Sequence, residues 1–316
     1  MSIHKAALAL LLVVPLAGQQ AVRPRVRSKL SIYSLKDNSV HVIHTAGRLF
    51  EAHNWSPDGK YLLSNSGGDL YRLPPDGKSE PQKLDLGGIR GCNNDHGISP
   101  DGRLIAFSAR HNAPGSQVYV ANADGSNARL VAEKVPSYYH GWSPDGKWLA
   151  YVGQRNGEFD TYRISVNGGE EQQLTTAKGL DDGPDYSPDG KWIYINSDRT
   201  GNFDIWRIPA DGAGPGDKKA QQVTNDEWED WFPHPSPDGK WMVFLSFEKG
   251  TQGHPANKNV QLRMMPLPGN RLEPAPIRVL TKLFGGQGTI NVNSWSPDSK
   301  RFAFVSYEIL PSAGAQ

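Results

Sequence analysis

Disulfides, charge bias and helix signals are nearly absent from this chain of 316 residues, and each absence narrows its class. The single cysteine, Cys92, cannot form an internal disulfide, so the fold depends on its packed core alone. The formal net charge is +1 with acids and bases interspersed, which argues against a nucleic-acid or membrane-surface partner. Helix signals are scarce beyond the N-terminal segment, which favours an all-β fold.

Two common catalytic signatures are also missing. The chain has no Gly-x-Ser-x-Gly elbow, which excludes a complete serine hydrolase of that type. It has no phosphate-binding glycine loop either, because the pairs Gly67-Gly68, Gly168-Gly169 and Gly285-Gly286 fall at expected turns or linkers. Cys92 with His96 could form a metal pair or a nucleophile–base pair, and a small linker residue fits Cys92 equally well.

Residues 1–21 have the pattern of a secretory signal peptide. A weakly basic start, His4-Lys5, precedes the apolar stretch Ala6–Leu16. This stretch is too short to span a bilayer as a stable anchor. No cysteine stands directly after it, which excludes a bacterial lipoprotein anchor. We therefore expect a periplasmic or secreted protein, without a membrane span, whose residues 22–316 form one domain.

A short phrase, Ser-Pro-Asp followed by Gly or Ser and then a basic residue, recurs six times along the chain. The copies begin at Ser56, Ser99, Ser143, Ser187, Ser236 and Ser296, in steps of 43, 44, 44, 49 and 60 residues. Units of this length that consist of strands and turns are typical of a β-propeller with one repeat per blade.

The third unit has the clearest strand pattern. It contains four apolar or β-branched segments separated by turn residues: Tyr139–Ser143, Lys147–Val152, Phe159–Ile164 and Gln172–Thr175. Proline and glycine in the Ser-Pro-Asp-Gly phrase favour a tight turn between the first two. The unit predicts a four-stranded antiparallel meander.

The ends of the chain predict how the ring closes. The last copy supplies only two strands, Asn291–Ser296 and Arg301–Tyr307, and the segment before the first copy supplies two more, Leu30–Leu35 and Val40–His44. Joining them completes a last blade and removes exposed sheet edges. We predict an all-β, six-bladed propeller with four-stranded antiparallel blades, in which N- and C-terminal strands share the last blade.

The repeats resemble those of TolB-type propellers. The resemblance rests on motifs such as Trp142-Ser-Pro-Asp-Gly-Lys147 and Ser197-Asp-Arg-Thr-Gly-Asn-Phe-Asp-Ile-Trp206, and it extends over residues 29–307. It implies the fold, whereas related repeats occur in periplasmic scaffolds, peptidase accessory domains and sugar lyases. We expect no counterpart of the N-terminal α/β domain of TolB, because only a few residues separate the predicted signal peptide from the first predicted strand. Oligogalacturonate lyases, which hold manganese with His and Gln, are a more distant resemblance from which no residue is carried over.

The copies differ at the position three residues before the repeat serine. TolB-like repeats usually have proline there, as at Pro184 and Pro233. Four histidines and one asparagine instead occupy this position or the next one, at the start of the innermost strand, where they would line the mouth of the central channel: His53, His96, His140, His234 and Asn293. Imidazole clusters suit divalent metals. We predict a metal site, for Mn, Zn or Ca, formed by the four histidines, although polar filler is the simpler reading of any single one.

The same face should gather side chains from turns and linkers. Arg155 and Arg199 lie in turns, and the linker Glu227–Trp231 is acidic and aromatic. The predicted catalytic residues are His234, Arg155, Arg199, Glu229 and Asp230, and the predicted substrate-binding residues are Trp228, Trp231, Tyr138, Tyr139 and Asn293. His234 would be the general base, because its ordinary pKa is near neutrality. Arg155 or Arg199 would hold a substrate carboxylate.

Two functions follow from these predictions. The first is a metal-dependent lyase or hydrolase that acts on acidic oligosaccharides, since metal-supported β-elimination from uronic acids needs a cation, a base and an arginine. The second is a non-catalytic, TolB-like scaffold that binds a protein or another cell-envelope partner. A monomer is expected in both cases.

Overall fold

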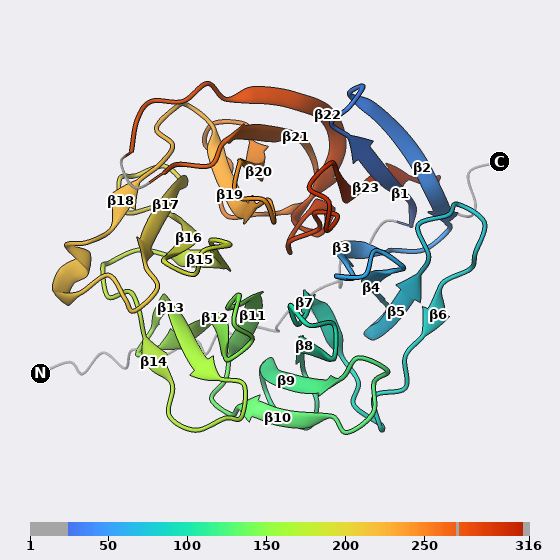
Figure 1. Ribbon diagram of the computed structural model, residues 1–316, viewed down its shortest axis with the longest axis horizontal. Helices are drawn as coiled ribbons and strands as arrows, with labels where there is room; N and C mark the ends of the chain where they lie inside the picture. Colours follow the sequence, from blue (N-terminus) through green and yellow to red (C-terminus); the bar gives the residue numbers. More distant parts are fainter. Residues whose placement is uncertain (1–24, 270–271, 312–316) are drawn as a thin grey trace, which may run out of the picture.

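The computed structural model describes residues 25–269 and 272–311. Its strands form six sheets arranged radially in a ring (Figure 1). Five sheets have four antiparallel strands in meander order, and the sixth combines β2, β1 and β23. The predicted six-bladed β-propeller is confirmed. In the described residues, no helix is long and apolar enough to cross a membrane. The predicted signal peptide lies outside this part of the chain.

The strands follow the chain blade by blade. The first two blades contain β3 (Glu51–Trp55), β4 (Leu62–Ser66), β5 (Asp69–Leu73) and β6 (Gln82–Lys83), then β7 (Cys92–Ile98), β8 (Leu104–Ala109), β9 (Gln117–Asn122) and β10 (Arg129–Ala132). The third and fourth contain β11 (Ser137–Trp142), β12 (Trp148–Arg155), β13 (Glu158–Ser165) and β14 (Gln172–Gln173), then β15 (Asp181–Tyr186), β16 (Trp192–Ser197), β17 (Asp204–Pro209) and β18 (Gln221–Gln222). The fifth contains β19 (Glu229–Pro235), β20 (Trp241–Phe247), β21 (Ala256–Pro266) and β22 (Arg278–Gly286). The closing blade contains β1 (Val26–Ser34), β2 (Ser39–Ala46) and β23 (Arg301–Ile309), and two short 3₁₀ turns are η1 (Pro215–Asp217) and η2 (Gln287–Thr289).

The repeated phrase is a self-contained turn between the inner strand and the next. In the third blade the Ser143 hydroxyl donates to Asp145 at 2.6 Å and accepts the backbone N–H of Trp148 at 2.9 Å. Gly146 has a φ of 70°, which glycine adopts without strain. The serine–aspartate bond recurs in all six copies. The motif is therefore a folding element, which explains its repetition.

The ring closes through the first described strand. β1 lies between β2 and β23, and Leu30 is paired with His44 on one side and Val305 on the other. At the end of the sheet the Leu310 N–H donates to the Arg25 carbonyl at 2.8 Å. The predicted closure by strands from both ends is thus confirmed.

One predicted strand of this blade is wrong. Residues 291–296 form only an isolated bridge, Trp295 with Phe302. Their polar side chains bind across the channel instead: Asn291 donates to Asp95 at 2.7 Å and Asn293 donates to Asp185 at 2.9 Å. These contacts hold the segment where an inner strand would lie, without a full ladder to β23.

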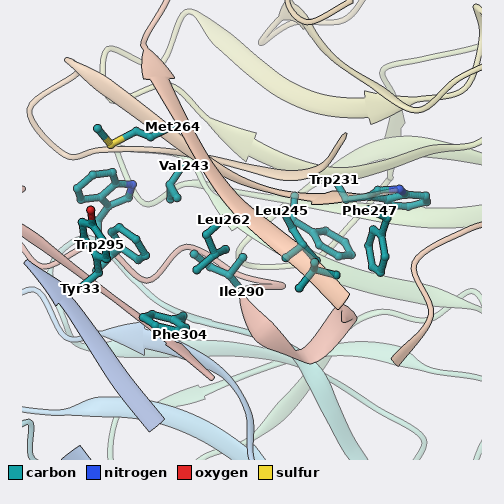
Figure 2. Packing of buried hydrophobic residues seen from close by; sticks show 13 residues of the cluster. Tyr33, Trp231, Val243, Leu245, Phe247, Leu262, Met264, Ile290, Trp295 and Phe304 are labelled. Atoms are coloured by element: carbon teal, nitrogen blue, oxygen red, sulfur yellow. The ribbon is translucent and has the colours of Figure 1, made fainter. Parts of the chain in front are cut away.

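Aromatic and aliphatic side chains fill the spaces between blades. The largest buried cluster joins the fifth blade to the closing blade, and it includes Trp231, Leu262, Tyr33 and Phe304 (Figure 2). Flat sheets stacked around a ring need such large apolar side chains between them. The inner strands consequently have fixed positions around the channel.

Candidate functional site

Every inner strand from β3 to β19 has a shift in its pairing register near the predicted histidine position. In the third blade the shift falls between Tyr139 and Gly141, so His140 has no partner in the ladder. In three other blades the residue just before the position that corresponds to His140 has a positive φ: 42° at Ala52, 62° at Gly183 and 55° at Phe232. Such bulges interrupt the alternation of faces along a strand. They redirect side chains at the channel.

His53 and His96 are buried and bound to neutral groups. His53 Nδ1 is hydrogen-bonded to the Ser64 hydroxyl. His96 Nδ1 contacts the side-chain oxygen of Asn54 at 2.6 Å. Burial, and to a smaller extent a neighbouring imidazole, lowers the pKa of each ring to about 3. Both rings are therefore neutral near pH 7.

His140 and His234 instead contact carboxylates of another blade. His140 Nε2 lies 3.1 Å from Asp182, and His234 Nδ1 lies 3.1 Å from Asp185. His234 Nε2 also donates to the Ile290 carbonyl at 2.7 Å. Together with His96, these rings connect neighbouring blades around the channel.

The expected grouping of the four imidazoles is not found. Across residues 25–269 and 272–311, no three His, Cys, Asp or Glu side chains lie so that they could hold a metal ion. Each predicted ligand already has its own protein partner. Metal binding stays a prediction that metal analysis of the purified protein would test.

The two predicted arginines are held in ion pairs. Arg155 contacts Glu171 at 2.8 and 3.0 Å and the Pro136 carbonyl at 2.9 Å. Arg199 contacts Asp181 at 2.8 Å and Asp217 at 3.2 Å. Since their guanidinium groups are engaged within the blades, neither is free to hold a substrate carboxylate without breaking these pairs.

Glu229 and Asp230 have structural partners too. Glu229 accepts backbone N–H groups of Phe203 and Gly250, each at 2.8 Å, and so fixes two turns. Asp230 is fully buried and accepts the Ser246 hydroxyl at 2.6 Å and Arg263 at 3.0 Å. Burial raises the pKa of Asp230 to about 7, although the charge of Arg263 opposes the shift.

This pKa predicts how stability depends on pH. Because the pKa of Asp230 is about 7 in the folded protein and 3.8 in its ordinary state, the folded state binds more protons between these values. The contribution of Asp230 to stability is complete below pH 3.8 and is lost as the pH rises through about 7. We expect Asp230→Asn to flatten the fall in unfolding free energy across this window. Denaturant titrations of both proteins measure it, and equal slopes would contradict the assignment.

The predicted substrate-binding residues separate into three groups. Trp231 is buried in the core, so it cannot contact a ligand in this structure, whereas Tyr139, which is also buried, lines the mouth on the side of the Ser-Pro-Asp turns. Tyr138 lines the channel mouth on the predicted face, and Trp228 lines a separate pocket on the fifth blade. Asn293 lines the opposite mouth.

The predicted mouth contains a cavity of about 300 Å³ whose main polar group is Asp182. Asp182 lies 3.1 Å from His140 and 3.4 Å from His254, which comes from the long turn of the fifth blade. Burial alone would raise the pKa of Asp182, but the two imidazoles hold it well below its usual range. In turn, burial lowers the pKa of His140, but Asp182 outweighs this effect and keeps it above its ordinary value.

A second carboxylate, Asp95, lines the same cavity. It accepts hydrogen bonds from Asn291 at 2.7 Å and Asn93 at 2.5 Å, and burial raises its pKa. Among the described residues, neither lysine nor arginine lines this cavity. The polar lining of this mouth therefore combines two carboxylates with two imidazoles, and an acidic sugar at this mouth stays a prediction.

The other mouth, on the side of the Ser-Pro-Asp turns, was not anticipated. It contains a cavity of about 390 Å³ walled by the six repeat prolines and by aromatic residues that immediately precede the repeat serines: Trp55, Trp142, Tyr186 and Trp295. A signal was present in the sequence, because four of six copies have an aromatic residue at this one position.

The six repeats and the closed ring define the class of this protein as a β-propeller with one repeat per blade. Residues 98–267 match the family model of the TolB beta propeller domain. An uncharacterized protein of Agrobacterium fabrum, Atu1656, is 46% identical over 282 residues, which are 89% of this chain and 93% of that protein. The chain belongs to the TolB β-propeller family.

Two solved structures show the range of the resemblance. A structure from Agrobacterium tumefaciens that is named provisionally as TolB is 45% identical, with a TM-score of 0.84 over 91% of this chain and 99% of that chain. An oligogalacturonate lyase from Vibrio parahaemolyticus is 13% identical, with a TM-score of 0.51 over 83% of this chain and 74% of that chain. The second likeness concerns the fold alone.

Proposed function

We propose that this protein is a non-catalytic binding module whose channel mouth receives a cationic side chain of a polypeptide partner. One observation carries the proposal: Asp95 and Asp182 face the same cavity, and among the described residues that line it the only counter-charges are the imidazoles of His140 and His254. A lysine or arginine of a partner would supply the missing charge. Tyr138 at the rim offers a ring for a cation–π contact.

The geometry favours binding over catalysis. A lyase would need a base and a free arginine beside an open metal position. His234, the predicted base, is instead bonded on both ring nitrogens, and Arg155 and Arg199 are paired. Action on acidic oligosaccharides with a bound metal remains the competing prediction. Unsaturated products from uronate oligosaccharides incubated with manganese would establish it. A periplasmic or secreted location also stays a prediction.

Calorimetry with short peptides tests the binding function. Peptides that carry lysine or arginine should bind, and matched peptides with glutamate in their place should not. Asp95→Asn should weaken binding about tenfold, since a hydrogen bond to a charged group is lost. Asp185→Asn, in the opposite mouth, is the matched control and should leave binding unchanged. If no cationic peptide binds, or if Asp95→Asn binds as well as the parent protein, the proposal fails.

A further inference from the structure

Besides the cavities at the two mouths, a separate pocket lies on the fifth blade. It has a volume of about 450 Å³, within the range of small-molecule sites. Its polar and aromatic lining comes from the linker before β19, the turn after β20, and strands β21 and β22: Trp228, Glu248, Asn259, Gln261, Lys282 and Phe284. Strand pairing explains this gathering, because Gln261 is paired with Ser246 on β20 and with Lys282 on β22.

Gln261 is the polar lining residue that indicates most clearly that the pocket can hold a ligand. It is 7% exposed and lines the pocket, yet no hydrogen bond joins its amide to any described residue. The amide atoms are not sealed from solvent, so they can form hydrogen bonds with water or with a ligand in the pocket. Its Ser246 neighbour is already engaged with Asp230. The amide is therefore available to whatever enters the pocket.

The other polar side chains of the pocket are equally available. Glu248, Asn259 and Lys282 are exposed, and no hydrogen bond or ion pair links their side chains to the described residues. Trp228 is fixed from two sides: its backbone N–H donates to Asp226 at 2.9 Å, and the Arg263 guanidinium lies 5.9 Å from its ring. The pocket thus combines a positioned indole with unpaired amides and one charge of each sign.

We infer that this pocket binds a neutral pyranoside unit of an oligosaccharide. Each side-chain amide offers a donor and an acceptor side by side, and adjacent sugar hydroxyls require both. The apolar face of a pyranose ring can pack on the indole of Trp228. The opposite charges of Glu248 and Lys282 favour a neutral ligand over an acidic one. This site is independent of the cationic-ligand site in the channel. It gives Trp228 a carbohydrate ligand, as the sequence predicted, but in a pocket of the fifth blade and not at the channel mouth.

Calorimetry or saturation-transfer NMR on the full chain tests the inference. The probes are oligosaccharides of glucose, galactose and N-acetylglucosamine. We expect at least one to bind, and Trp228→Ala and Gln261→Leu each to weaken it about tenfold. Trp148→Ala, another partly buried tryptophan stacked on an arginine, is the control that should bind normally. Because the Gln261 amide has no protein partner, Gln261→Leu should keep the melting temperature, so lost binding cannot be ascribed to unfolding.

Two results would overturn the inference. Either no oligosaccharide in the panel binds the parent protein, or binding survives both pocket variants unchanged. Neither result bears on the channel, because the peptide experiment reads a different site. A shared failure of both experiments would leave the propeller without either proposed ligand.

Discussion

A chain that lacks residues 22–44 should show no cooperative thermal transition. The deletion removes β1, which is hydrogen-bonded to strands on both sides, and most of β2. It also removes Leu30 and Tyr33 from two buried clusters and leaves β23 with an open edge. Circular dichroism and calorimetry would measure the loss.

The control is a chain that begins at Arg25, which keeps every described strand. It should melt cooperatively. A chain without residues 22–44 that melts like this control would show that the ring does not depend on its closing strand.

Trp231→Ala should lower the free energy of unfolding by about 3–5 kcal/mol. The side chain is fully buried, with ring centroids 4.0 Å from Phe203 and 4.6 Å from His254. Its removal would leave a large cavity between the fourth and fifth blades. Denaturant titration gives the value directly.

Trp228→Ala provides the matched comparison, three residues earlier and just before β19. Its ring is only partly buried, so the loss in unfolding free energy should be much smaller than for Trp231→Ala. Trp231→Phe should lie between the two because it keeps a ring in the core. Equal stabilities for Trp231→Ala and the parent chain would restore Trp231 as a candidate for ligand contact.

The fold was predictable because the sequence patterns that specify its turns and strands are local. Each Ser-Pro-Asp turn is closed by bonds between residues two to five positions apart, so it can be recognised in six separate places. The strand that follows each of the first five turns is a short segment that is buried along nearly its whole length. The exception, residues 291–296, depends on Asn291 and Asn293, whose partners belong to other blades. Local patterns contain no information on such contacts.

The candidate site was harder to predict than the fold, because it depends on contacts between residues that are far apart in the sequence. A shared register placed His53, His96 and His140 correctly at the inner strands, but bulges there break the alternation that would give their directions. Asp182, which contacts both His140 and His254, gains its role only when distant turns meet. The positive charge of Arg155 suggested a contact with a substrate carboxylate. That prediction could not take into account that Glu171 of the same blade neutralises this arginine.

The closing blade also determines how the molecule would respond to a pulling force. Val26 is paired with Ile309, and the two ends of the described chain leave the sheet at the same corner. In an antiparallel pair the hydrogen bonds run perpendicular to the strands. Tension between the ends would therefore load these bonds one after another, beginning at Arg25 and Leu310, and not all together. The ladder that closes the ring and stabilises it against thermal unfolding would therefore open one hydrogen bond at a time under a force applied at its ends.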